Sequence, residues 1–116
     1  MVLVVGGFAS GKLEYVKKIL NYSDNQISHA QIDSKPVLNN LHLLVKNAGI
    51  DAIDLNWLLS KEVVICDEIG CGIVPASAGE RKWREDTGRL CILLAQNANK
   101  VVRLQCGIAS VIKSQQ

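Results

Sequence analysis

Apolar residues occur along the chain in two patterns. Some form continuous runs, and others stand singly, three or four positions apart. Residues 2–5 and 63–66 are continuous and rich in valine and isoleucine, which is typical of parallel strands buried on both faces. Shorter apolar runs predict further strands at residues 26–32, 101–106 and 108–112. The pattern thus predicts a series of short strands separated by longer segments.

The longer segments carry apolar residues at helical spacing. Residues 11–20 place Leu13, Val16 and Leu20 on one side, with lysines between them. Residues 78–98 form the longest predicted helix, and a shorter one opens at Asp51 or Asp54. Strands that alternate with helices and are joined by short connections predict a parallel sheet between two layers of helices.

A further helix is predicted from residue 33 to Gly49. Asp33 is a capping residue shortly before Pro36, and proline is favoured in the first turn of a helix. Gly49 is a typical helix stop. The apolar face of this predicted helix consists of Leu38, Leu41, Val45 and Ala48. We therefore expect an α/β three-layer sandwich like the P-loop NTPases, with a small, mostly parallel sheet and one domain over residues 1–116.

Composition supports a globular fold and narrows the partners. Of the 116 residues, 48% are hydrophobic and 21% are charged, which argues against disorder. The net charge of +2 does not suggest a nucleic-acid partner, and no run of about 18–20 apolar residues predicts a membrane span. The four cysteines (66, 71, 91 and 106) form no CxxC pair, so a zinc site is disfavoured and reduced cysteines in a cytoplasmic protein are expected.

The first candidate site follows the first strand directly. A strand that turns through glycines into a helix can direct its backbone N–H groups at a phosphate, and a following lysine can reach the β- and γ-phosphate oxygens. The G-x-x-x-x-G-K pattern of such a P-loop is met by Gly6, Gly7, Phe8, Ala9, Ser10, Gly11 and Lys12. Leu13 stands where the motif has a serine or threonine that binds Mg²⁺, which weakens or displaces metal binding there.

The second candidate site follows the strand at residues 63–66. Asp67 and Glu68 come at its carboxyl end, and in a parallel sheet these ends line the ligand crevice. One carboxylate would hold Mg²⁺ or its waters, with Asp67 the candidate ligand, and the other would orient or deprotonate a hydroxyl. Because side chains alternate along a strand, both face the metal only if the strand has already ended.

Three stretches of the chain resemble one enzyme family. Residues 68–75 read E-I-G-C-G-I-V-P, similar to the N-E-V-G-x-G-I-V-P signature of the adenosylcobinamide kinase/adenosylcobinamide-phosphate guanylyltransferase family. Residues 81–92 are close to the family's R-x-F-R-D-x-x-G-x-x-N-Q, and residues 107–113 match its ending G-I-x-x-x-I-K. With the P-loop, the resemblance covers roughly the first 20 residues and everything after Val63.

The chain departs from this family in several places. The family's middle segment is longer and holds the histidine that accepts GMP, whereas this chain has only His29 and His42. We expect His42 to be a helix-surface residue and His29 to lie in a weak strand. Neither is therefore assigned the role of the family's GMP-accepting histidine. Asp67 replaces an asparagine, and Cys91 with its neighbour replaces Asn-Gln. The chain thus resembles a shortened relative.

The resemblance implies phosphorylation of a hydroxyl on adenosylcobinamide with ATP or GTP and Mg²⁺, in a protein that forms a propeller-like trimer. Lys12 would hold the triphosphate, and Asp67 or Glu68 would serve as metal ligand or base. The implied substrate-loop residues are Gly70, Gly72, Pro75 and Arg84. Leu13 and the missing middle segment favour an alternative, a nucleotide-binding or regulatory protein with weak catalysis.

Overall fold

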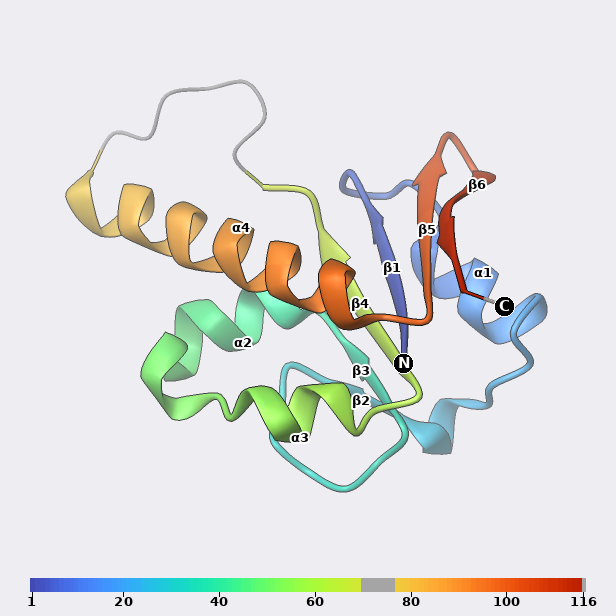
Figure 1. The fold of residues 1–116 in the computed structure, drawn as a ribbon, viewed down its shortest axis with the longest axis horizontal. Coiled ribbons are helices and arrows are strands. Elements are labelled where there is room, and N and C mark those ends of the chain that lie inside the picture. The colour runs from blue at the N-terminus through green and yellow to red at the C-terminus, as the bar shows by residue number, and fades with distance from the viewer. Residues whose placement is uncertain (70–76, 116) are drawn as a thin grey trace.

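The computed structural model describes residues 1–69 and 77–115. Its centre is a six-stranded sheet in the order β2-β3-β4-β1-β5-β6, in which only the pairing of β5 with β6 is antiparallel (Figure 1). The strands are β1 (Val2–Gly6), β2 (Ile27–His29), β3 (Val37–Asn39), β4 (Val63–Asp67), β5 (Lys100–Gln105) and β6 (Ile108–Ser114). The mostly parallel α/β sandwich predicted from the sequence is confirmed.

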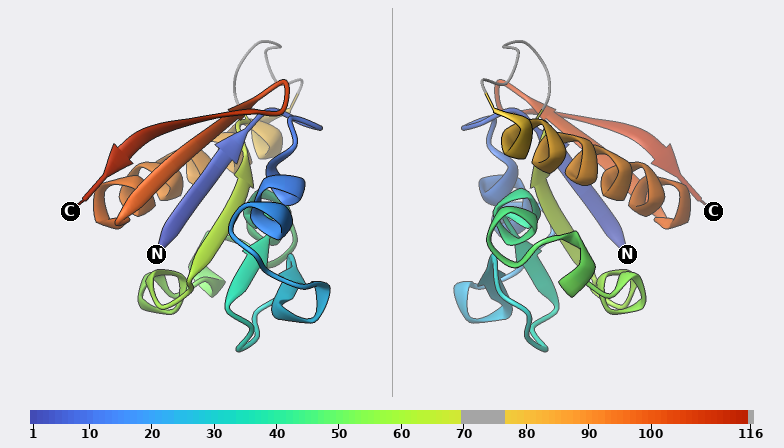
Figure 2. Two further views of the ribbon diagram at one scale, coloured as in Figure 1. Left: turned by 90° about the vertical axis from the view of Figure 1, so that its right-hand side faces the viewer. Right: turned by 90° about the vertical axis from the view of Figure 1, so that its left-hand side faces the viewer.

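Helices cover both faces of this sheet, as the two side views in Figure 2 show. On one face, α1 (Lys12–Lys18) packs its buried Val16 on Val4 and Ile65. The other face is covered by α2 (Leu41–Ala48), α3 (Leu55–Leu59) and α4 (Ala78–Asn97). Because neighbouring strand residues point to opposite faces, the apolar runs of β1 and β4 supply both cores at once.

Side-chain caps fix two of the helix starts. The Asp54 carboxylate accepts the N–H of Asn56 at 2.9 Å, so the shorter helix begins after Asp54 rather than Asp51. The Ser77 hydroxyl accepts the N–H of Glu80 at 3.1 Å at the start of α4. None of the described helices is long and apolar enough to cross a membrane.

The helix predicted from residue 33 is partly wrong, because β3 occupies its first half. Val37 and Leu38 pair in parallel with Val63 and Val64 of β4 and are fully buried in the sheet. This place in the sheet buries Leu38 in the core on one face and Val37 in the core on the other, which outweighs the helix signal of the capping residue and proline. Asn40 then adopts a left-handed conformation (φ 61°), and α2 follows it.

Candidate functional site: the P-loop pocket

The register of the sheet places the two candidate motifs side by side. Gly6, the last residue of β1, pairs with Asp67 on one neighbour and with Leu104 on the other. The Glu68 N–H donates to the Gly6 carbonyl oxygen at 2.8 Å, which holds the end of β4 to the start of the P-loop. A Cβ atom at Gly6 would lie 2.5 Å from the carbonyl oxygen of Leu104 and from Ser10 Oγ, so only glycine fits there.

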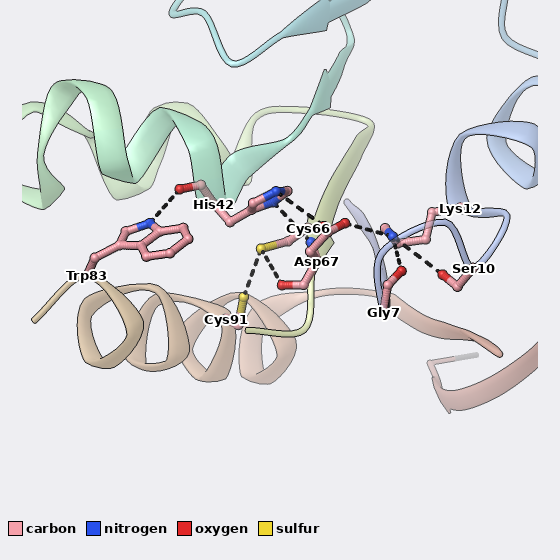
Figure 3. A network of polar contacts seen from close by, with 8 residues as sticks. All are labelled: Gly7, Ser10, Lys12, His42, Cys66, Asp67, Trp83 and Cys91. Atoms are coloured by element: carbon pink, nitrogen blue, oxygen red, sulfur yellow. Dashed lines mark hydrogen bonds and ion pairs between the residues drawn. The ribbon is translucent and has the colours of Figure 1, made fainter. Parts of the chain in front are cut away.

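Lys12 lies folded back over the loop that precedes it (Figure 3). Its Nζ donates to the Gly7 carbonyl oxygen at 2.7 Å and lies 3.4 Å from Ser10 Oγ. It also forms an ion pair with Asp67 Oδ1 at 2.8 Å. Lys12 is only 7% exposed, so its charge is balanced chiefly by this carboxylate.

His42 is buried beside Asp67, and the expectation of a helix-surface histidine is wrong. The backbone N–H of Asp67 donates to His42 Nδ1 at 3.1 Å, and His42 Nε2 lies 3.4 Å from Asp67 Oδ2. The prediction failed because β3 moves α2 to the carboxyl edge of the sheet, where the second residue of the helix faces the pocket. Polar residues at and just after the end of an apolar strand, here Asn39, Asn40 and His42, are the signal that marks this edge.

The protonation state of His42 follows from its contacts. Burial lowers the pKa of His42, an effect that nearby Asp67 opposes and nearby Lys12 reinforces. The ring is therefore neutral near pH 7. Because Nδ1 accepts a hydrogen bond, the ring proton resides on Nε2 and faces the Asp67 carboxylate. One carboxylate thus contacts a lysine through Oδ1 and an imidazole through Oδ2.

A second set of contacts ties α4 to this cluster. Trp83 Nε1–H donates to the His42 carbonyl oxygen at 2.7 Å, and Lys46 Nζ lies 4.8 Å from the Trp83 ring centroid. Cys66, the residue before Asp67, lies with its Sγ 3.6 Å from Cys91 Sγ on α4. The long helix is therefore anchored to the pocket at two points, as Figure 3 shows.

These residues line an open cavity of about 660 Å³ at the carboxyl edge of the sheet. Its walls come from the P-loop, the start of α2, the end of β4 and Trp83 of α4. Phe8, at the tip of the loop, is 91% exposed. Residues lining the cavity are Phe8, Ala9, Ser10, Gly11, Lys12, Leu13, Glu14, Asn39, Asn40, His42, Leu43, Asp67, Ile69 and Trp83. The cavity's volume is within the range of small-molecule sites.

Glu68 faces away from Asp67, as strand alternation predicts. Its carboxylate is paired with the Arg103 guanidinium of β5 through two contacts, Nε to Oε1 at 2.9 Å and Nη2 to Oε2 at 3.1 Å. Glu68 borders a pocket with residues 7–10 and Arg103, and it also lines a mostly apolar cavity together with Asp67. The structure brings Lys12 and Asp67 together and leaves Glu68 in a separate ion pair.

The side chains present are a poor fit for Mg²⁺. This ion prefers six oxygen ligands and in nucleotide sites is bound through one or two carboxylates together with phosphates. Leu13 is partly buried against the apolar cluster between α1 and the sheet. Both carboxylate oxygens of Asp67 already have partners, Lys12 and His42. Within residues 1–69 and 77–115, no group of three or more His, Cys, Asp or Glu residues could hold a metal.

The remaining predicted residues lie elsewhere. Arg84 pairs with Glu80 along α4, with 3.4 Å between Nη2 and Oε1. His29 is exposed on β2, where its Nδ1 lies 3.0 Å from the Asn39 side-chain amide nitrogen. The three predicted loop residues, Gly70, Gly72 and Pro75, lie outside the described residues.

Comparison with known families adds an independent finding. A family model described as cobinamide kinase / cobinamide phosphate guanyltransferase matches residues 50–112, more than half of the chain. Both activities in that description use a nucleotide. The matched segment contains Asp67 but begins after the P-loop, so the P-loop assignment stands on its own motif and geometry. A search of curated proteins finds no match.

Proposed function

Because the chain belongs to the cobinamide kinase / cobinamide phosphate guanyltransferase family, we propose that it is a nucleotide-dependent kinase of cobalamin biosynthesis. ATP or GTP occupies the P-loop pocket, and its terminal phosphoryl group passes to a hydroxyl of adenosylcobinamide. The observation that supports this most is the cluster of Lys12, Asp67 and His42 at the P-loop. Phosphoryl transfer depends mainly on positioning and on charge stabilisation, and this cluster offers both.

Nucleotide binding exchanges one partner of Lys12 for another. In the free chain its ammonium group is held by Asp67 Oδ1. A triphosphate in the loop, bound by backbone N–H groups of residues 7–12, carries more negative charge than one carboxylate and takes over the lysine. The exchange leaves the buried ammonium paired throughout, so it avoids the cost of an uncompensated charge.

The same exchange creates a base. Once the phosphate takes Lys12, Asp67 Oδ1 loses its cation and is free to accept the proton of an acceptor hydroxyl. His42 holds the other oxygen, Oδ2, and the Asp67 backbone N–H, so the carboxylate keeps its orientation. His42 is thus a positioning residue in this proposal. Glu68, paired with Arg103, is the weaker candidate base.

We assign the guanylyl-acceptor role to neither histidine. Both nitrogens of His42 face Asp67 at 3.1 and 3.4 Å, and the side chain is 8% exposed. His29 is not among the residues that line the P-loop cavity. Incubation with labelled GTP tests this assignment, because a stable GMP–protein adduct that His29→Ala removes would contradict it.

Substrate capture and assembly complete the proposal. Gly70, Gly72 and Pro75 belong to the proposed substrate loop, in which the glycines would let the backbone approach the corrinoid, and Arg84 would steady phosphate charge. Self-association, as a trimer or another homo-oligomer, is supported by exposed apolar side chains on the edge strand β6. These are Ile108, Val111 and Ile112, which are 70%, 53% and 60% exposed.

A second candidate function is nucleotide binding without transfer. Leu13 supports it, since the position that holds the metal in complete P-loops is apolar here. In that case the Lys12–Asp67 exchange would still accompany binding, and the protein would act through its nucleotide-bound state.

One assay separates the two functions. The chain is incubated with γ-labelled ATP or GTP and adenosylcobinamide, with Mg²⁺ or with a chelator, and label on the corrinoid is measured. Transfer that disappears in Lys12→Ala and in Asp67→Asn supports the kinase. Nucleotide binding without transfer, in a chain of demonstrated fold, refutes the kinase and leaves the binding protein.

A further inference from the structure

Two cysteines far apart in the sequence meet next to the P-loop pocket. Cys66 lies at the end of β4 and Cys91 in the second half of α4, and their Sγ atoms are 3.6 Å apart (Figure 3). A disulfide needs about 2.05 Å between the sulfurs. The gap between the two sulfurs is therefore about 1.5 Å.

The two thiols differ in access. Cys66 has none of its surface exposed and donates a hydrogen bond to the carbonyl oxygen of Asp67 at 3.4 Å. Cys91 is only partly buried and lines a second cavity of about 320 Å³ between α4 and the sheet. That cavity has mostly apolar walls, among them Leu3, Val5 and Ile92. A small neutral reagent can thus reach Cys91, whereas Cys66 is reached only through Cys91.

We propose that Cys66 and Cys91 form a redox-modification site, in which a small-molecule disulfide converts the two thiols into a reversible intramolecular bond between β4 and α4. The thiol chemistry is independent of the kinase reaction proposed above. Because Asp67 follows Cys66 directly and α4 also carries Trp83, the bond would fix both sides of the cluster around His42.

The exchange takes place in two balanced steps. The Cys91 thiolate attacks one sulfur of the small disulfide, forms a mixed disulfide and expels one small thiolate. The Cys66 sulfur then attacks Cys91 Sγ, its proton goes to the departing sulfur, and a second small thiol leaves. In total, two protein thiols are oxidised and one small disulfide is reduced to two thiols. The hydrogen-bond contact with Cys66 also lowers the pKa of Cys91, which favours Cys91 as the first nucleophile.

The test uses the full chain and 2-hydroxyethyl disulfide, a small neutral oxidant. After brief exposure under native conditions the free thiols are alkylated, and the chain is digested and mapped by mass spectrometry. We expect a Cys66–Cys91 cross-link as the main product, reversed by dithiothreitol. In urea, where the fold no longer holds the pair together, we expect a mixture of pairings among the four cysteines. The same mixture under native conditions, or no intramolecular bond, would overturn the proposal.

Three single variants test the order of the steps. Cys66→Ser should accumulate the mixed disulfide on Cys91, because the second thiol is missing. Cys91→Ser should leave Cys66 unmodified in the folded chain, since the Cys66 side chain is fully buried. Cys106→Ser, which removes an exposed cysteine on the turn between β5 and β6, is the matched control and should form the bond like the wild type. A mixed disulfide on Cys66 in Cys91→Ser would contradict the assigned order.

Discussion

Replacing Asp67 by asparagine should weaken the fold and strengthen nucleotide binding when metal is absent. In the free chain the variant replaces the carboxylate partner of the Lys12 ammonium by a neutral amide, beside the neutral Gly7 carbonyl oxygen and Ser10 Oγ. Loss of one partner of a fully buried ion pair costs roughly 3–5 kcal/mol. Because the Asp67 side chain is 16% exposed beside an open cavity, about 2 kcal/mol is the better expectation for the free energy of unfolding.

The bound state does not suffer the same loss, because the phosphate neutralises Lys12 there. Most of the free energy of unfolding that the free variant loses should therefore be recovered as a more favourable free energy of nucleotide binding. A difference of about 2 kcal/mol corresponds to roughly 30-fold tighter binding. Repulsion between Asp67 and the phosphate, which the substitution also removes, acts in the same direction. Phosphoryl transfer should fall at the same time, since the variant lacks the base.

The assay is a titration of ATP and of GTP in the presence of a chelator, together with thermal unfolding of the free chain. Asp33→Asn is a matched control, because Asp33 lies 3.6 Å from the buried ammonium of Lys61, away from the P-loop cavity. The control should lose stability and keep the wild-type affinity. Equal or weaker nucleotide binding by Asp67→Asn in chelator would refute the exchange of partners at Lys12.

Three further substitutions test separate parts of the site. Gly6→Ala should cost at least about 2 kcal/mol and abolish nucleotide binding, whereas Gly7→Ala, whose Cβ has open space, should leave the unfolding temperature almost unchanged. Burial lowers the pKa of His42, so the buried, neutral imidazole stabilises the fold. This stabilisation is complete above the ordinary histidine pKa of about 6.5 and is lost as the pH falls toward the lowered pKa. Unfolding measured from pH 7.5 to 5 should thus depend less on pH in His42→Gln than in the wild type. Leu13→Thr should make nucleotide binding respond to Mg²⁺ at a cost of about 1 kcal/mol in stability, and titrations with and without the ion measure this gain.

The parts of the site that the sequence predicted are those encoded by neighbouring residues. The P-loop is a continuous motif after an apolar strand, and Asp67 ends a second such strand. Their proximity follows from a general property of parallel sheets, in which the carboxyl ends of the strands share one edge. The sequence paired Asp67 with Glu68 at the site and limited this only by strand alternation, whereas in the structure the two carboxylates form separate ion pairs, with Lys12 and with Arg103.

His42 was missed because its position depends on a long-range pairing. Local signals around Pro36 favour a helix, and apolar spacing continues through Leu41. Pairing with β2 on one side and β4 on the other places residues 37–39 inside the sheet, where Val37 and Leu38 are buried in the cores on its two opposite faces. The contact between Cys66 and Cys91 was hidden for the same reason, as it depends on how α4 lies across the sheet.

The kinase and the binding protein differ, in physical terms, in what happens to Asp67 Oδ1 after a phosphate takes Lys12. The pocket already supplies a buried cation for the nucleotide, while Leu13 removes the side chain that would hold a metal. Charge balance therefore favours phosphate binding whether or not transfer follows. Transfer further requires that an acceptor hydroxyl reach Oδ1 while His42 keeps Oδ2 in place. Asp67→Asn is expected to bind nucleotide tightly and to transfer nothing. That result would show that the Asp67 carboxylate weakens nucleotide binding and is required for phosphoryl transfer.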